Sequence, residues 1–227
     1  MTTTFLSEIK STMQMTEPVT FFDVGANVGQ TIEQMRSIFP QVTIYAFEPA
    51  LPVFTFVAEK NKNDKNLSIH QIALGCHEGT ETFLSDCSAS AGNRIIKNQT
   101  ITEPTETVSV LTGDTFCQEH KIEQIDFLKI DTEGYNIDVL GGFVNMLRAQ
   151  KIKYIQVECT TNLDNHFHVH LERFIHFLHP FGYRLFGLYE FNRQIYVTQQ
   201  KLNGIWFCNA VFVTEIENPK LRTDGKN

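Results

Sequence analysis

Residues 19–24 read VTFFDV, and this nearly uninterrupted apolar run stops abruptly at Gly25. A short run of this kind is typical of a strand that is buried on both faces, as in a parallel sheet covered by helices. Gly29 follows, and residues 31–39 then carry apolar side chains at helical spacing. The pattern predicts a strand, a tight glycine loop and a helix. The loop is either an ordinary turn or a place where a ligand comes close to the backbone.

The same alternation continues along the chain. Further strands are predicted at 42–47, 67–74, 125–130, 153–157, 183–189 and 206–214, and further helices at 52–60, 113–120, 136–147 and 169–178. Alternation of strands and helices over most of the length indicates an α/β fold with one Rossmann-like, doubly wound sheet. In such sheets a ligand binds outside the carboxyl ends of the strands, at the point where the strand order reverses.

The chain divides into an N-terminal helix or arm (residues 1–18), a single domain (19–214) and a tail (215–227) in this interpretation. Within the domain, glycine, serine and proline interrupt residues 76–111. Short alternating runs at Thr80–Leu84 and Thr107–Leu111 predict that this part is a β-hairpin-like insertion. Residues Ser88–Asn93 of its loop could close over a ligand as a small lid.

The charge and the cysteines limit the possible partners and the possible cellular compartment. The 227 residues carry a formal net charge of −7 without a basic run, so neither a nucleic-acid partner nor membrane insertion is expected. Cysteines stand at 76, 87, 117, 159 and 208 and form no C-x-x-C pair, which favours reduced thiols. The N-terminus does not resemble a signal peptide, and no apolar stretch could span a bilayer. We therefore expect a cytoplasmic protein.

Glu48 ends the second predicted strand, where a carboxylate can accept hydrogen bonds from both hydroxyls of a ribose. The glycine loop is not a full dinucleotide fingerprint, because Asn27 and Gln30 stand where G-x-G-x-x-G requires glycine. Asp23 would repel a phosphate but suits an ammonium group. A ligand with a ribose and an amino-acid end but no phosphate fits, which describes S-adenosylmethionine. The alternatives are a Rossmann oxidoreductase using NAD or a nucleotide sugar, and a non-catalytic nucleoside-binding module.

Four stretches of the chain resemble the FkbM-type methyltransferases of the class I, S-adenosylmethionine-dependent superfamily. They are FDVGANVGQT, AFEP, ALG at 73–75 and DFLKIDTEGYNIDVLGG at 126–142. The resemblance covers about residues 19–213, and KIDTEG is its most specific part. It implies a sheet with a final antiparallel strand and methyl transfer, usually to oxygen, on sugars or natural products. Tyr135-Asn136 departs from the Ala-Glu that is common in the family, so the acceptor side is expected to differ from the commonest members.

On this resemblance, the residues expected to contact the cofactor are Asp23, Gly25, Ala26, Asn27, Gly29, Glu48, Pro49, Ala73 and Asp131. Asp131 ends the fourth core strand and could bind the amino group of the cofactor, orient an acceptor hydroxyl or ligate a metal. Glu158 ends the fifth in the same way. The two carboxylates could share a divalent cation or form hydrogen bonds to a polyol. Glu133 is expected to point away from this site and to cap the next helix, where its charge interacts favourably with the helix dipole.

Three histidines follow the fifth strand, at positions 166, 168 and 170. We assign the role of general base to His166, because a neutral imidazole on this loop could take a proton at physiological pH. Many sugar-modifying members of the resembled family have a histidine in a similar place. His168 and His170 are interpreted as solvated residues near a helix start.

The predicted catalytic residues are therefore His166, Asp131 and Glu158. Tyr189, Glu190 and Arg193 could line the acceptor pocket, and Cys159 is expected to be a buried thiol. The predicted reaction is S-adenosylmethionine-dependent O-methylation of a small-molecule acceptor. A sugar hydroxyl, a polyketide hydroxyl and a peptide group all stay open as acceptors, as do metal dependence and the oligomeric state.

Overall fold

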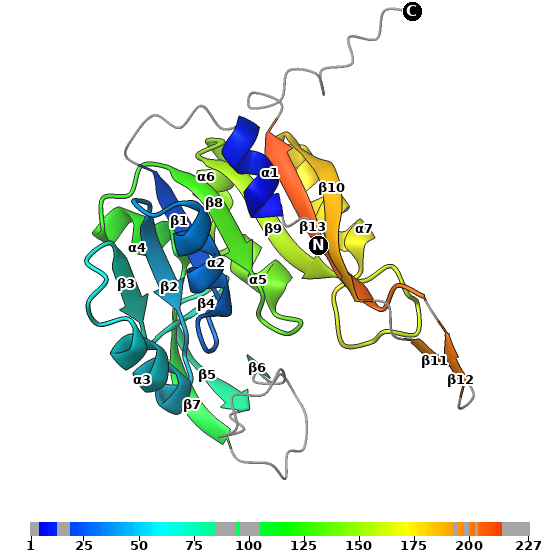
Figure 1. Cartoon of the computed structure of the whole chain (residues 1–227), viewed down its shortest axis with the longest axis horizontal. Helices are drawn as coiled ribbons and strands as arrows, with labels where there is room; N and C mark the ends of the chain where they lie inside the picture. Colours follow the sequence, from blue (N-terminus) through cyan, green and yellow to red (C-terminus); the bar gives the residue numbers. More distant parts are fainter. Residues whose placement is uncertain are drawn as a thin grey trace, which may run out of the picture.

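The computed structural model describes residues 5–12, 19–84, 94–95, 105–192, 195–197, 200–202 and 204–214 (Figure 1). Its centre is a seven-stranded sheet. In spatial order the strands are β10 (Tyr183–Asn192), β13 (Phe207–Thr214), β9 (Ile152–Cys159), β8 (Ile125–Ile130), β1 (Thr20–Val24), β2 (Thr43–Phe47) and β3 (Leu67–His70). Strands β3, β2, β1, β8 and β9 are parallel, and β13 is antiparallel to β9 and β10. The predicted Rossmann-like fold with an antiparallel final strand is confirmed.

The strand order reverses between β1 and β8. From β1 the chain first builds β2 and β3 on one side, and it then returns to place β8 and β9 on the other. Phe21 pairs in register with Phe127 and Phe22 with Leu128, and all four side chains are buried. The carboxyl ends of β1 and β8 therefore meet at the position where ligands bind in doubly wound sheets.

Helices cover both faces of the sheet (Figure 1). On one face, α1 (Phe5–Thr12), α2 (Gln30–Ile38) and α3 (Leu51–Lys60) share a core with Phe21 and Phe127. On the other face, Phe22 and Leu128 pack against α4 (Gly113–Glu119), α5 (Asn136–Gly141), α6 (Val144–Arg148) and α7 (Leu171–Leu178). A short 3₁₀ turn, His179–Phe181, follows α7. The helix predicted at 136–147 is divided after Gly141 into α5 and α6.

A second, four-stranded sheet lies at the edge of the molecule. It consists of β4 (Ala73–Leu74), β7 (Thr105–Leu111), β5 (Gly79–Leu84) and β6 (Arg94–Ile95), in that order. The prediction of one strand over 67–74 is wrong, because β3 ends at His70 and β4 changes partner to β7. The N–H of Glu48 donates to the carbonyl of His70 as the last contact, and Pro49 has no N–H to continue the ladder. The predicted strands at 80–84 and 107–111 pair as β5 and β7.

Three further segments complete the description. The hairpin of β11 (Ile195–Val197) and β12 (Gln200–Leu202) was not predicted. The predicted N-terminal helix or arm contains α1, whereas residues 85–93 and 96–104 of the predicted insertion and the tail lie outside the described residues. Within the described part of the chain, every helix is too short or too polar to cross a bilayer.

Candidate active site

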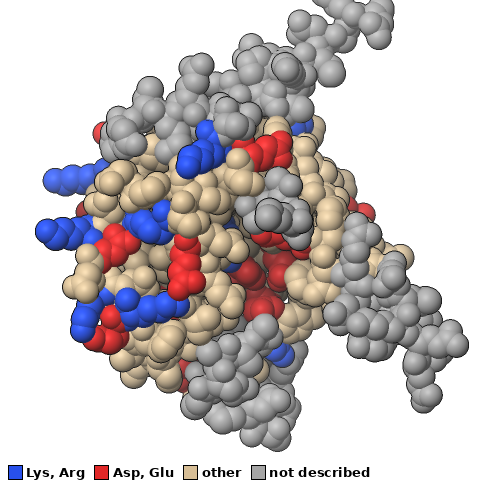
Figure 2. Space-filling model, viewed as in Figure 1, with Lys and Arg blue, Asp and Glu red and all other residues tan. Residues whose placement is uncertain are grey.

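A cavity opens where β1, β2 and β8 end, and the space between its walls, including the part open to solvent, is about 820 Å³. Figure 2 shows acidic side chains around a hollow near the middle of this face. The residues of the predicted cofactor set that line the cavity are Gly25, Ala26, Asn27, Glu48, Pro49, Ala73 and Asp131. Asp23 and Gly29 are not among its lining residues, so the structure brings together most of that set but not all of it.

One wall of this first cavity is apolar. Ile72 and Leu74 come from the segment that joins the two sheets, and Phe83 and Ile95 come from the second sheet. A slot of this kind suits a flat heteroaromatic ring. The sequence did not reveal these residues, because the position of the insertion over the cavity depends on the pairing of β4 with β7.

The two glycines of the loop are required by packing within the protein. Gly25 has φ +85°, and a Cβ there would lie 1.9 Å from the carbonyl oxygen of Asp131. Gly29 has φ +84°, and a Cβ there would lie 2.7 Å from Cγ2 of Val57. Both conformations favour glycine. Gly25 therefore allows the ends of β1 and β8 to meet, and Gly29 allows α2 to approach α3, so close contact with a ligand is not what these positions require.

Glu48 connects the loop to the end of β2. Its Oε2 accepts from the N–H of Asn27 at 3.0 Å, and its Oε1 accepts from the N–H of Ala50 at 2.9 Å. Burial raises the pKa of Glu48 to about 7, although these two hydrogen bonds act in the opposite direction. Each oxygen keeps a further lone pair for a ligand hydroxyl. Nearby, Asn27 Oδ1 is a buried acceptor for which the described residues provide no hydrogen-bond donor.

A buried lysine explains the position of Asp23. Lys129 Nζ lies 3.6 Å from Asp23 Oδ1 and 3.2 Å from Asp131 Oδ2. Burial works against the charge of Lys129, but the two carboxylates outweigh it and raise its pKa. Burial raises the pKa of Asp23 to about 6 despite the lysine. The ammonium group that Asp23 faces is therefore supplied by the protein itself. Sequence reasoning missed Lys129, although a lysine inside the apolar strand IDFLKI was a visible signal.

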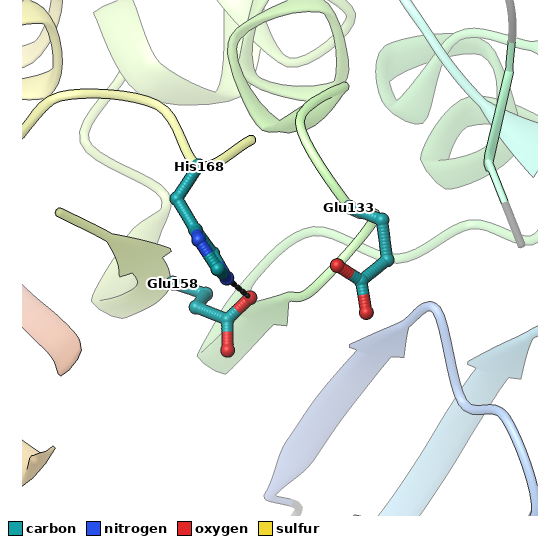
Figure 3. Close-up of side chains that lie close together, drawn as sticks. All are labelled: Glu133, Glu158 and His168. Atoms are coloured by element: carbon teal, nitrogen blue, oxygen red, sulfur yellow. Dashed lines mark ion pairs between the residues drawn. The ribbon is translucent and has the colours of Figure 1, made fainter. Parts of the chain in front are cut away.

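Glu133, Glu158 and His168 form a cluster beside the first cavity (Figure 3). His168 Nε2 lies 3.1 Å from Glu158 Oε2, and one ligand atom from each residue lies within 4.8 Å of the others. Burial raises the pKa of Glu133 to about 7, with repulsion from Glu158 and Asp131 adding to it. Burial also raises the pKa of Glu158, while the hydrogen bond from His168 lowers it. One imidazole and two carboxylates could hold a divalent cation, or could move a proton.

The prediction that Glu133 points elsewhere is wrong. Glu133 adopts φ +50°, and its side chain lines the first cavity and faces Glu158 rather than the next helix. Gly134 also has a positive φ, of +96°. Two successive left-handed residues turn the chain back toward β9, which the sequence pattern did not reveal.

The histidine loop differs from the expectation, because His168 and not His166 reaches Glu158. Asn165 is fully buried, and its Oδ1 accepts from the N–H groups of Phe167 and His168, both at 3.0 Å. Its Nδ2 donates to the carbonyl of Trp206 at 2.8 Å. This turn directs His168 inward, where its ring stacks on Phe207. His166 is exposed, and among the described residues no hydrogen bond or ion pair joins it to Glu158.

Asn136 has a structural role at the position where the chain departs from the family pattern. Its Oδ1 accepts from the N–H of Thr132 at 2.9 Å and from the Thr132 hydroxyl at 2.6 Å. Its Nδ2 donates to the carbonyl of Glu158 at 3.0 Å. Asn136 thus ties the loop after β8 to the end of β9 and fixes the separation of Asp131 and Glu158.

The remaining predicted residues lie in different places. Tyr189 donates to Glu8 Oε2 of α1 at 2.9 Å, and Glu190 accepts from Asn209. Cys159 is fully buried, with its sulfur 3.8 Å from that of Cys208, as expected for a buried thiol. Arg193 and Ser88–Asn93 lie outside the described residues. From the same insertion, Ile95 lines the first cavity and Arg94 lies over the ring of Phe167 at 5.3 Å.

Comparison with the sequences of known proteins adds three findings. The family model of the methyltransferase FkbM domain matches residues 23–185. The hexuronic acid methyltransferase AglP of Haloferax volcanii is 24% identical over 144 residues, which cover 63% of this chain and 56% of that protein. Methyltransferase 1 of Beauveria bassiana is 28% identical over 141 residues, which cover 53% of this chain and 56% of that protein. The matched part of the chain thus spans about half the length of these curated relatives.

A solved structure supports the fold. The YcgJ protein from Bacillus subtilis superposes with a TM-score of 0.51 and 9% identity, covering 92% of this chain and 97% of that one. At this identity the likeness concerns the arrangement of helices and strands, which agrees with the sheet order described above.

Proposed function

This chain belongs to the FkbM methyltransferase family, and from that premise we propose that it methylates a hydroxyl oxygen of a sugar or natural product with S-adenosylmethionine as donor. One observation carries the choice of cofactor. The first cavity joins a buried carboxylate at the end of β2 to a glycine loop and an apolar slot. This combination suits a ribose, an amino-acid end and an aromatic base, and the loop lacks the full G-x-G-x-x-G pattern that is typical of diphosphate binding.

The residues of the cavity fit the cofactor part by part. In this proposal Glu48 accepts hydrogen bonds from the ribose hydroxyls, and Ile72, Leu74, Phe83 and Ile95 contact the adenine. Asn27 Oδ1 is a buried acceptor for which the described residues supply no donor, and in this proposal it accepts from the amino group. Asp131, at the end of β8, also lines the cavity. Bound S-adenosylmethionine would supply an activated methyl group on a sulfonium.

The chain then has to align the acceptor and remove its proton. We assign proton removal to Glu158, with His168 as a positioning residue. His168 holds Oε2 of Glu158 at 3.1 Å, which leaves Oε1 to accept the hydroxyl proton. The acceptor oxygen forms its bond to the methyl carbon as the carbon–sulfur bond breaks. Alignment and general-base help are the two contributions that such a displacement needs.

A sugar acceptor is supported by the name of one relative, a hexuronic acid methyltransferase. The family resemblance supports transfer to oxygen. Both belong to the proposal, since the relative is 24% identical and is matched over 56% of its length.

The proposal does not require a metal at Glu133, Glu158 and His168. The only nitrogen of His168 that faces the cluster already contacts Glu158 directly. We therefore expect turnover to survive excess EDTA and to be unchanged by added Mn²⁺. Loss of turnover with EDTA and its recovery with Mn²⁺ would assign the three side chains to a cation instead.

Calorimetry with S-adenosylhomocysteine, NAD and NADP tests the cofactor assignment. We expect the first to bind and the other two to give no heat. Glu48→Gln should weaken binding about tenfold, because hydrogen bonds to a charged group are stronger than those to a neutral one. Glu119→Gln, the same change at an exposed residue of α4, is the control. Binding of NAD in place of S-adenosylhomocysteine would favour an oxidoreductase, and cofactor binding without methylation of any acceptor would favour a binding module.

A further inference from the structure

A second cavity, of about 560 Å³, lies beside the first on the face of the sheet covered by α1 and α2. The two cavities share Gln30, Thr31, Lys129 and Asp131 as lining residues. Leu6 of α1 belongs to its outer wall. A methyl acceptor has to enter next to the donor, because the displacement is in-line. A cavity that adjoins the cofactor site along four residues meets this requirement.

The floor of the second cavity is a polar layer within the sheet. Lys129 pairs in register with Asp23 on one side and Gln156 on the other, so the three side chains project from the same face. Asn209 of β13 pairs with Glu158 of β9 on that face. Asp23, Lys129 and Gln156 are 0%, 8% and 6% exposed.

One strand position below this layer, the same face is apolar. Phe127 and Tyr154 contact Phe5 of α1 there, with ring centroids 6.0 Å and 5.4 Å apart. Burial of polar side chains is unfavourable unless they are hydrogen-bonded. A layer of lysine, glutamine and asparagine at the ends of the strands, above an aromatic core, is therefore best explained by a polar ligand.

The charges in the second cavity decide between kinds of polar ligand. Lys129 already lies between the carboxylates of Asp23 and Asp131, at 3.6 Å and 3.2 Å. Its charge is therefore balanced before any ligand enters. Glu190 adds a further carboxylate, to which Asn209 donates. The cavity thus offers amides and carboxylates but no uncompensated cation among the residues that line it, so it disfavours an anion and suits hydroxyl groups.

We propose that the second cavity is the acceptor subsite and that it selects an uncharged, polyhydroxylated ring over the corresponding uronic acid. This inference rests on the proposed function and names its substrate class. Glu158 follows Gln156 by one step on the same face of β9, at the strand end. A ring in the cavity can therefore present a hydroxyl between Glu158 and the shared wall at Asp131. The relative AglP is named for hexuronic acid, so the two proteins would differ in the charge of the acceptor.

Saturation-transfer NMR on the protein saturated with S-adenosylhomocysteine tests the selection directly. The probes are the methyl glycosides of glucose, galactose and mannose and their three uronate counterparts, each at the same concentration. We expect a signal from at least one neutral glycoside, and a signal at least about fivefold weaker from its uronate, which corresponds to one lost hydrogen bond or one repulsive contact.

Three variants and one control variant locate the binding in the second cavity. Gln156→Leu removes the buried amide, and Gln34→Leu removes an exposed amide from the wall where folding is not at risk. Both should lower the neutral-glycoside signal about fivefold while leaving the heat of S-adenosylhomocysteine binding unchanged. Gln41→Leu, an exposed glutamine distant from the lining, is the matched control and should behave as wild type. Glu190→Gln removes the repulsive charge and should raise the uronate signal relative to the neutral one.

The outcomes separate this inference from the proposed function. Failure of S-adenosylhomocysteine to bind overturns the proposed function, and the inference with it. If the cofactor binds normally, three results would overturn the inference and leave the proposed function standing. The uronates bind as well as the neutral glycosides, no neutral glycoside gives a signal, or Gln156→Leu and Gln34→Leu both retain the full wild-type signal.

Discussion

The two oxygens of Glu48 have a structural role, and in our proposal they also bind the cofactor. Its contacts with the N–H groups of Asn27 and Ala50 hold the glycine loop against the end of β2. The same side chain lines the cavity that we assign to the cofactor. Replacement of this side chain therefore affects both the shape of the loop and the hydrogen bonds to a ligand, and glutamine separates the two effects better than alanine does.

The pH dependence of cofactor binding follows from Glu48. Burial raises its pKa to about 7, so the charged acceptor is depleted below that pH. We expect the affinity for S-adenosylhomocysteine, measured by calorimetry, to rise as the pH increases through about 7 and then to level off. Glu48→Gln should flatten this curve. Glu133 also has a pKa of about 7, so Glu133→Gln is the control that should keep the dependence. The reverse pattern would assign the titration to Glu133.

Glu158 and His168 lead to different kinetic expectations. Glu158→Gln should lower turnover by about 10²–10⁴-fold and leave the affinity for S-adenosylhomocysteine unchanged. His168→Ala should lower turnover less and should move the acidic limb of the rate profile to higher pH, because the hydrogen bond from His168 lowers the pKa of Glu158.

His166→Ala is the matched comparison, since His166 is exposed on the same loop. We expect it to retain turnover. Loss of turnover in this variant, with His168→Ala unaffected, would support the assignment made from the sequence.

At the scale of elements, the loop after β1 and the end of β8 fit together through Gly25. A Cβ at this position would lie 1.9 Å from the carbonyl oxygen of Asp131. We expect Gly25→Ala to destabilise the protein by at least about 3 kcal/mol, from strain at positive φ and from displacement of the β8 end. Thermal unfolding should show a lower Tm, and S-adenosylhomocysteine should bind weakly.

Gly79→Ala provides the control for that substitution. Gly79 also has a positive φ, of +143°, but apart from its chain neighbours no heavy atom of the described residues lies within 4 Å of a Cβ built there. It therefore has the backbone strain without the overlap, and its loss of Tm should be smaller. Equal losses in the two variants would show that strain alone, and not the contact with Asp131, makes glycine necessary.

The sequence predicted elements where the pattern is local and failed where a distant segment decides. Buried strands such as 125–130 were predicted with their bounds, because an apolar run between turn residues reports burial on both faces. The break at His70 and the inward turn of His168 were missed. The first depends on where β2 ends, and the second on a hydrogen bond between Asn165 and the carbonyl of Trp206, 41 residues away. Carboxylates at strand ends could be located, but not the partners that orient them.

At the scale of the whole molecule, the buried carboxyl groups of the site make the stability depend on pH. Burial raises the pKa of Asp23 to about 6 and those of Glu48 and Glu133 to about 7, above the values of 3.8, 4.5 and 4.5 for the free groups. The folded state therefore keeps protons that the unfolded state loses between about pH 4 and pH 7. The free energy of unfolding of the unliganded protein should fall as the pH rises through this window.

Thermal unfolding at a series of pH values checks this expectation. We expect a lower Tm at about pH 8 than at about pH 5, with each kcal/mol worth about 2–4 °C for a chain of this size. His70 opposes the trend, because burial lowers its pKa and the folded state loses stability when the unfolded state binds a proton there. Glu48→Gln should reduce the slope. A Tm that rises steadily from acid to neutral pH would contradict the expectation.

The contacts around Gly25 also determine when the conformational entropy of this loop is lost. Its N–H and that of Ala26 both donate to the carbonyl of Phe47, and its Cα abuts the carbonyl of Asp131. Three neighbouring strands are thereby locked to one another before any guest arrives. The conformational entropy needed to order this part of the site is therefore lost during folding and not during ligand binding. A ligand that fits then binds to a preorganised site.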